Sequence, residues 1–124
     1  METEKINSYK DLKVWNIGMK VASDIIKLSE KFPNNQKFII TSQIQRSAIS
    51  IPSNIAEGYS RDGTKEYIYH ISVALGSLSE LETQLLLSEK VGFCLAKDIE
   101  KTLEELTILG KMLKKLSLSL KAKL

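Results

Sequence analysis

Apolar residues recur every three or four positions along most of this chain, a spacing that favours amphipathic α-helices over strands. The most regular run lies near the C-terminus, where the spacing alternates between four and three residues, as in helical bundles and coiled coils. Its members are Ile99, Leu103, Leu106, Gly110, Leu113, Ser117, Leu120 and Leu124. Aromatic residues make up only 6% of the chain, so few of the side chains that strands favour are present. We therefore expect an all-α fold.

Helix-stopping residues divide this pattern into four segments. Pro33 and the two asparagines after it end the first segment, Gly58 ends the second, and Gly92 ends the third. The expected helices cover residues 11–31, 37–59, 64–90 and 97–121. Their similar lengths and short connections predict an antiparallel up-down-up-down four-helix bundle, with residues 1–124 as a single domain.

Each expected helix carries an apolar stripe that can face a common core. The stripe of the first consists of Leu12, Trp15, Met19, Ala22 and Ile26. The stripe of the second consists of Ile40, Ile44, Ala48, Ile51 and Ile55. The stripe of the third consists of Tyr67, Ile71, Ala74, Leu78, Leu81 and Leu85. Pro52 lies within the second helix and has no backbone N–H, so we expect a kink there.

Further apolar residues lie outside these stripes. Residues 85–87 are three consecutive leucines, and residues 106, 108 and 109 are also large and aliphatic. These runs place apolar side chains on more than one face of their helices, whereas a single bundle needs one stripe per helix. The surplus predicts a second buried interface, and self-association into a homo-oligomer is the simplest explanation.

Positive charge is concentrated at the end of the last helix. The net charge is +3, and the last fourteen residues contain five lysines and no Asp or Glu. Without those five lysines, 13 of the 18 Lys and Arg residues remain, against 15 Asp and Glu. The net charge is therefore −2 for residues 1–110 and +5 for residues 111–124. Such an end can contact nucleic acid or an acidic membrane surface, or can simply be solvated. The candidate nucleic-acid-binding residues are Lys111, Lys114, Lys115, Lys121 and Lys123, with Arg61 added from the turn after the second helix.

A set of polar residues shares one face of the second helix. Arg46, Ser50, Asn54, Glu57 and Arg61 fall within about 80° of one another at about 100° per residue. One interpretation is a face that binds phosphate or bases through its arginines. The other is a structural network that joins this helix to the third helix or to another subunit. We favour the structural interpretation because Glu57 repels phosphate. The expected network consists of Arg46, Ser50, Asn54, Glu57 and Glu80.

The chain offers little for catalysis or metal binding. Cys94 is its one cysteine and His70 its one histidine, which excludes zinc sites built from several of these residues and di-iron sites with two histidines. Glu66 lies four residues before His70 and can orient it, but no nucleophile turn or phosphate-binding loop accompanies the pair. We expect no enzyme activity and no cofactor. A charged N-terminus and the lack of an apolar run of roughly 18 residues predict a cytoplasmic protein without a membrane partner.

One stretch of the second helix is more specific than a generic bundle. Residues 43–58 read QIQRSAISIPSNIAEG and are followed by Arg61. Together with YKDLKVW at 9–15, KFP at 31–33 and ALGSLSEL at 74–81, this stretch resembles the four-helix-bundle family of 23S rRNA intervening-sequence proteins. The resemblance extends over roughly residues 9–120.

This family is encoded within insertions in bacterial 23S rRNA genes and is also similar to the accessory protein of diversity-generating retroelements. That protein resembles a five-fold barrel of bundles and binds nucleic acid, so the resemblance implies a homopentamer with a basic surface. We expect a noncatalytic homo-oligomer that contacts rRNA or other nucleic acid electrostatically. The alternative is a scaffold for protein–protein interaction whose basic end only keeps it soluble.

Overall fold

The computed structural model describes residues 5–124, and within them it contains helices and no strands. Four long helices account for most of this range: α1 (Lys13–Ser29), α2 (Ser42–Ser60), α3 (Thr64–Lys90) and α4 (Ala96–Lys121). Short helical turns occur at Tyr9–Asp11, Asn34–Gln36 and Lys37–Thr41. The expected all-α class is therefore confirmed. No helix in the described range is both long and apolar enough to cross a membrane.

The chain enters α1 through a separate capped turn. The Ser8 hydroxyl accepts a hydrogen bond from the Lys10 backbone N–H at 3.2 Å, and Asp11 Oδ2 accepts one from the Ser8 N–H at 3.2 Å. These reciprocal bonds close a 3₁₀ turn, so α1 begins at Lys13, two residues after the expected start. The helix ends at Ser29, whose hydroxyl donates to the Ile26 carbonyl at 3.0 Å.

α2 begins later than the expected second helix, and the helix is continuous across Pro52. Residues Lys37–Thr41 form a π-helical turn, and regular α2 follows from Ser42 to Ser60 without a break at Pro52. Pro52 is buried and lies against Gly18 of α1, where an added Cβ would lie 3.4 Å from the Pro52 Cβ. The missing side chain at Gly18 therefore lets α1 approach the proline ring closely.

α3 covers the residues that the pattern predicts, and α4 begins one residue earlier than expected. Gly92 has a positive φ of 87°, and the Phe93 N–H donates to the Ser88 carbonyl at 2.8 Å. This is the glycine-capped helix end expected at the end of α3.

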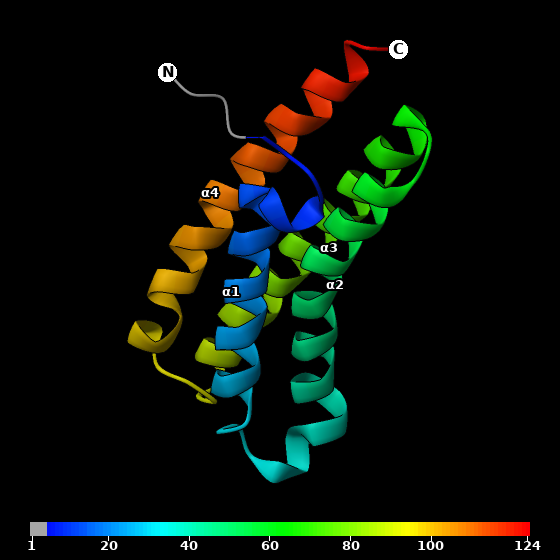
Figure 1. Cartoon of the computed structure of the whole chain (residues 1–124). Helices are drawn as coiled ribbons and strands as arrows, with labels where there is room; N and C mark the ends of the chain where they lie inside the picture. The colour runs from blue at the N-terminus through cyan, green and yellow to red at the C-terminus, as the bar shows by residue number, and fades with distance from the viewer. Residues whose placement is uncertain (1–4) are drawn as a thin grey trace.

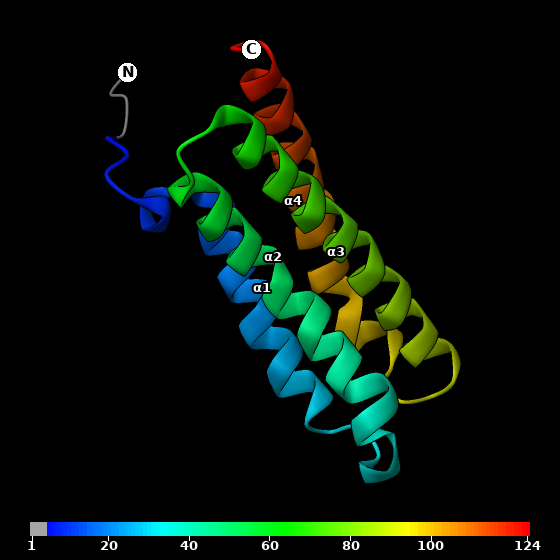
Figure 2. The same cartoon turned by 90° about the vertical axis from the view of Figure 1, so that its right-hand side faces the viewer.

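The four helices lie side by side, with the start of α1, the α2–α3 turn and the end of α4 at one end of the molecule (Figures 1 and 2). Hydrogen bonds set the pairing of α2 with α3. Ser47 Oγ donates to Gln84 Oε1 at 2.7 Å, and the Ser50 and Ser77 hydroxyls lie 2.8 Å apart. As the residue number increases along α2, the number of its hydrogen-bonded partner on α3 decreases.

All four helices contribute to one core. Its largest fully buried side chains are Val21, Ile25, Ile44, Ile51, Ile55, Ile71, Leu81, Leu85, Ile99, Leu106, Leu109 and Leu113. The expected stripes of α2, α3 and α4 supply most of these residues. Leu124, the last member of the expected α4 stripe, is exposed.

α1 buries a different stripe from the one that its spacing predicts. Its core face consists of Val14, Gly18, Val21, Ala22, Ile25 and Ser29. Of the expected stripe, Trp15, Met19 and Ile26 instead line a groove between α1 and α2. Both stripes recur at spacings of three and four, and Ala22 belongs to both, so periodicity alone cannot separate them. The choice is made by contact with the other helices.

Candidate functional site

A chain of polar side chains joins α2 to the first half of α3. Asn54 Nδ2 donates to Ser50 Oγ at 3.0 Å, and the Ser50 hydroxyl in turn meets that of Ser77. On its other side, Asn54 Oδ1 lies 2.9 Å from His70 Nδ1. Because an amide oxygen can only accept, this ring nitrogen carries the hydrogen. The chain of bonds therefore runs within the molecule and satisfies groups that α2 and α3 partly bury together.

Charged residues lie at the surface beside the His70 end of this chain. Glu57 Oε2 lies 3.8 Å from His70 Nε2 and 2.6 Å from an Arg61 guanidinium nitrogen. Arg61 also lies 3.7 Å from Glu66 Oε2. The hydrogen bond from Arg61 lowers the pKa of Glu57, and the bond to Glu57 raises the pKa of Arg61. Arg61, a candidate phosphate donor in the sequence, is thus held between two carboxylates.

The structure brings together only part of the expected polar network. Ser50, Asn54 and Glu57 take part in it, whereas Arg46 and Glu80 are exposed. Within residues 5–124, neither Arg46 nor Glu80 forms a side-chain hydrogen bond or an ion pair. The sequence pattern did not identify Ser77 and His70 as partners, because their pairing with α2 depends on how the two helices pack.

The five lysines between Lys111 and Lys123 are all exposed, and within the described residues none forms an ion pair. They do not share one face. Lys114 and Lys121 border a hollow between α4 and α3, whereas Lys115 borders another between α4 and α1 that also contains Lys13. Lys111 and Lys123 border neither hollow. The positive charge therefore surrounds the end of α4.

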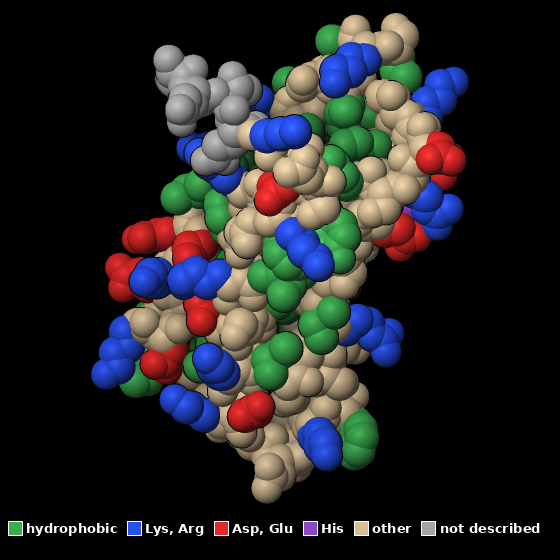
Figure 3. Space-filling view, viewed as in Figure 1, with side chains coloured by type: hydrophobic (Ala, Val, Ile, Leu, Met, Phe, Trp, Pro, Cys, Tyr) green, Lys and Arg blue, Asp and Glu red, His purple; other side chains and the backbone are tan. Residues whose placement is uncertain are grey.

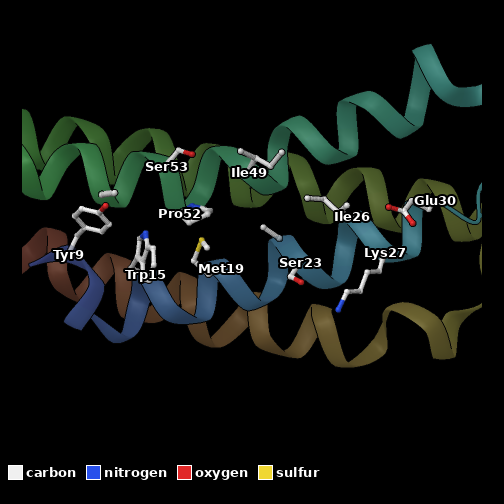
Figure 4. Close-up of a pocket in the computed structure, with 12 residues that line it drawn as sticks. Tyr9, Trp15, Met19, Ser23, Ile26, Lys27, Glu30, Ile49, Pro52 and Ser53 are labelled. Atoms are coloured by element: carbon white, nitrogen blue, oxygen red, sulfur yellow. The ribbon is translucent and has the colours of Figure 1, made fainter.

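An apolar groove of about 640 Å³ runs along the junction of α1 and α2. Figure 3 shows hydrophobic side chains gathered on this face, and Figure 4 shows Met19 and Trp15 reaching from α1 toward Pro52 of α2. Met19 and Ile49 are each 46% exposed. Lys27 and Glu30 border the groove with opposite charges, so it carries no strong preference for either sign.

His70 and Cys94 were the candidates for chemistry. His70 hydrogen-bonds to Asn54 and lies 3.8 Å from Glu57, and the Glu66 carboxylate that the spacing suggested as its partner lies against Arg61 instead. Cys94 is buried, and its desolvation, together with nearby acidic side chains, raises the pKa of its thiol. Within residues 5–124, no cluster of three or more His, Cys, Asp or Glu side chains is placed to hold a metal ion.

Comparison with known proteins adds a family. The family model described as 23S rRNA-intervening sequence protein matches residues 10–115. The fold is also similar to a crystal structure described as a protein with unknown function from the S23 ribosomal protein family from Bacteroides thetaiotaomicron, with a TM-score of 0.78 and 27% identity. That similarity covers 84% of this chain and 97% of the other. No curated protein matches the sequence.

Proposed function

Since the match spans residues 10–115, the chain belongs to the 23S rRNA-intervening sequence protein family, and we propose that it is a noncatalytic protein that contacts RNA or DNA electrostatically. The observation that carries this proposal is the lysine-rich end of α4, where five exposed lysines have no carboxylate partner in the described chain. Unpaired lysines attract phosphates and release counterions when they bind them. The working compartment that we propose is the cytoplasm.

The proposal includes self-association of an antiparallel up-down-up-down bundle. The opposed pairing along α2 and α3 supports the helix order. The apolar groove between α1 and α2, with Met19 and Ile49 partly exposed, supports an interface between copies of the chain. Five is the number of copies that we propose, from the resemblance to the retroelement accessory protein.

Binding through lysines predicts a steep dependence on salt. If about four phosphates of a duplex are contacted, affinity falls roughly a hundredfold between about 50 and 200 mM salt. Replacing two lysines at the α4 end, Lys114→Glu with Lys115→Glu, should weaken binding at least about tenfold and lower the salt slope. Fluorescence anisotropy with a labelled RNA duplex measures both effects.

The matched control reverses the same amount of charge at the other end of α4. Lys97→Glu with Lys101→Glu changes two exposed lysines in the first turns of the helix, and we expect near-normal binding from this variant. Equal loss in both double variants would mean that net charge alone matters and that the α4 end is no specific interface.

A protein-interaction scaffold is the second candidate, and the apolar groove favours it. Binding of a protein partner in this groove would change little with salt, because burial of apolar surface is not screened. If wild-type protein binds no nucleic acid even at low salt, the scaffold becomes the better account.

A further inference from the structure

The exposed Tyr69 side chain lies between two hollows near the end of α4. One hollow, of about 530 Å³, is formed by α3 and α4 and is bordered by Lys114 and Lys121. The other, of about 410 Å³, includes Lys65 and Arg61. Tyr69 lines both hollows and is 64% exposed. Its neighbours therefore come from α3, from α4 and from the turn before α3.

The ring of Tyr69 contacts His70 on one side, and most of the Tyr69 side chain is exposed to solvent. It packs against the ring of His70 at a centroid distance of 5.3 Å and an angle of 77°. His70 is itself bonded to Asn54. The ring is therefore supported by the polar network of α2 and α3 while most of its surface stays accessible.

The charge around Tyr69 is unbalanced toward positive. Within residues 5–124, Lys65, Lys114 and Lys121 form no ion pair, whereas Glu66, the one carboxylate that borders the hollows, lies against Arg61. A ligand that fits this surface carries several negative charges and a flat group that can stack on an aromatic ring. Single-stranded nucleic acid has both properties, and bases stack on exposed aromatic rings while phosphates meet lysines.

We propose that the α3–α4 surface around Tyr69 binds single-stranded nucleic acid, with a base stacked on Tyr69 and phosphates at Lys65, Lys114 and Lys121. This proposal rests on the proposed function and adds to it a preference for unpaired strands. In a duplex the bases stack on one another and are not available to Tyr69, so the ring contributes only to binding of single strands.

The test compares a labelled 12-nucleotide single-stranded RNA with a 12-base-pair RNA duplex. Tyr69→Ala should weaken binding of the single strand by between about fivefold and 150-fold, the range that stacking of one base implies. Binding of the duplex should change less than twofold. Tyr69→Phe keeps the ring and should bind both nearly as wild type does, and circular dichroism checks that each variant remains helical.

Phe38 provides a matched control. It is an exposed aromatic beside a lysine, with Lys37 Nζ 5.8 Å from its ring centroid. It belongs to the turn Lys37–Thr41, which precedes α2 at the opposite end of the molecule (Figure 1). Phe38→Ala should leave binding of the single strand unchanged. An equal loss in both alanine variants would overturn the assignment of the site to Tyr69.

The remaining outcomes separate the two proposals. If Tyr69→Ala binds the single strand as tightly as wild type while the α4 lysines still matter, the stacking site is wrong and the proposed function stands. If wild-type protein binds neither of the two RNAs, nor DNA of the same lengths, at low salt, both fall. Capture of a Glu-rich amphipathic peptide at this surface, with no binding of the single strand, would assign the surface to an acidic protein instead.

Discussion

Gly58 lies where α2 and α3 approach each other closely. A Cβ added there would lie 2.7 Å from the His70 Cβ and 3.3 Å from the Tyr67 carbonyl oxygen. The sequence suggested Gly58 as the stop signal of a helix over residues 37–59, and α2 ends one residue later, at Ser60. Because Gly58 has no side chain, His70 can lie close to α2. In that position His70 reaches Asn54, and the polar chain can form.

Gly58→Ala should therefore destabilise the protein, because its Cβ collides with atoms that belong to the neighbouring helix. We expect a loss of about 1–3 kcal/mol in the free energy of unfolding, the usual cost of overpacking. Urea denaturation followed by circular dichroism measures this loss.

Gly76→Ala is the control on the same pair of helices. An added Cβ at Gly76 meets nothing within 4 Å, so only helix propensity changes, and stability should rise by up to about 1 kcal/mol. A similar loss in both variants would mean that glycine has some other role in these helices.

At the scale of the element, the end of α2 is tied to the start of α3 by charge. The Glu57–Arg61 pair joins the last turn of α2 to the residue that follows it, and Arg61 extends to Glu66 in the first turn of α3. The 3.6-residue period places Glu57 and Arg61 on the same helix face, so this contact follows from the spacing of the sequence. The contact with Glu66 depends on the turn between the helices.

The lowered pKa of Glu57 gives this contact a definite dependence on pH. Because the folded pKa is below the unfolded value of about 4.3, the contribution to stability is present above that value and is lost as pH falls through the folded pKa. Glu57→Gln should lower the urea midpoint slightly at pH 7, and the difference from wild type should vanish by about pH 2. A difference that stays constant with pH would contradict the ion pair as its source.

α1 shows how an element can have two interpretations. Its expected stripe through Met19 and its actual core stripe through Val21 have the same spacing, since each fits a helical period. The stripe through Val21 is the one that is buried against the other helices. It includes Gly18, whose missing side chain leaves room for the buried Pro52 ring. Trp15, Met19 and Ile26 of the other stripe line the α1–α2 groove.

At the scale of the whole molecule, that groove and the α4 end lie on different parts of the surface. The groove lies between α1 and α2, and the hollow beside Lys114 and Lys121 lies between α3 and α4. A chain arranged in this way can associate with its copies through one surface and leave the other available to a polyanion.

Met19→Glu should therefore separate assembly from folding. A charge at this half-exposed position cannot enter an apolar interface without loss of its hydration, so we expect the mass in light scattering to fall to that of a single chain. The helical circular dichroism signal should persist. Ser79→Glu, on an exposed position of α3, should leave the mass unchanged, and a wild-type protein of single-chain mass would remove the assembly proposal.

The sequence by itself determined the helices and most of their core residues, because periodicity, prolines and glycines act within a few positions along the chain. It also located the unpaired lysines, since no acidic residue follows Lys111. Only the tertiary structure decided which α1 stripe is buried, that His70 lies against Asn54, and that Tyr69 lines the same hollow as Lys114 and Lys121. Those pairings join residues far apart in the chain, and they follow from how whole helices pack, which no local pattern encodes.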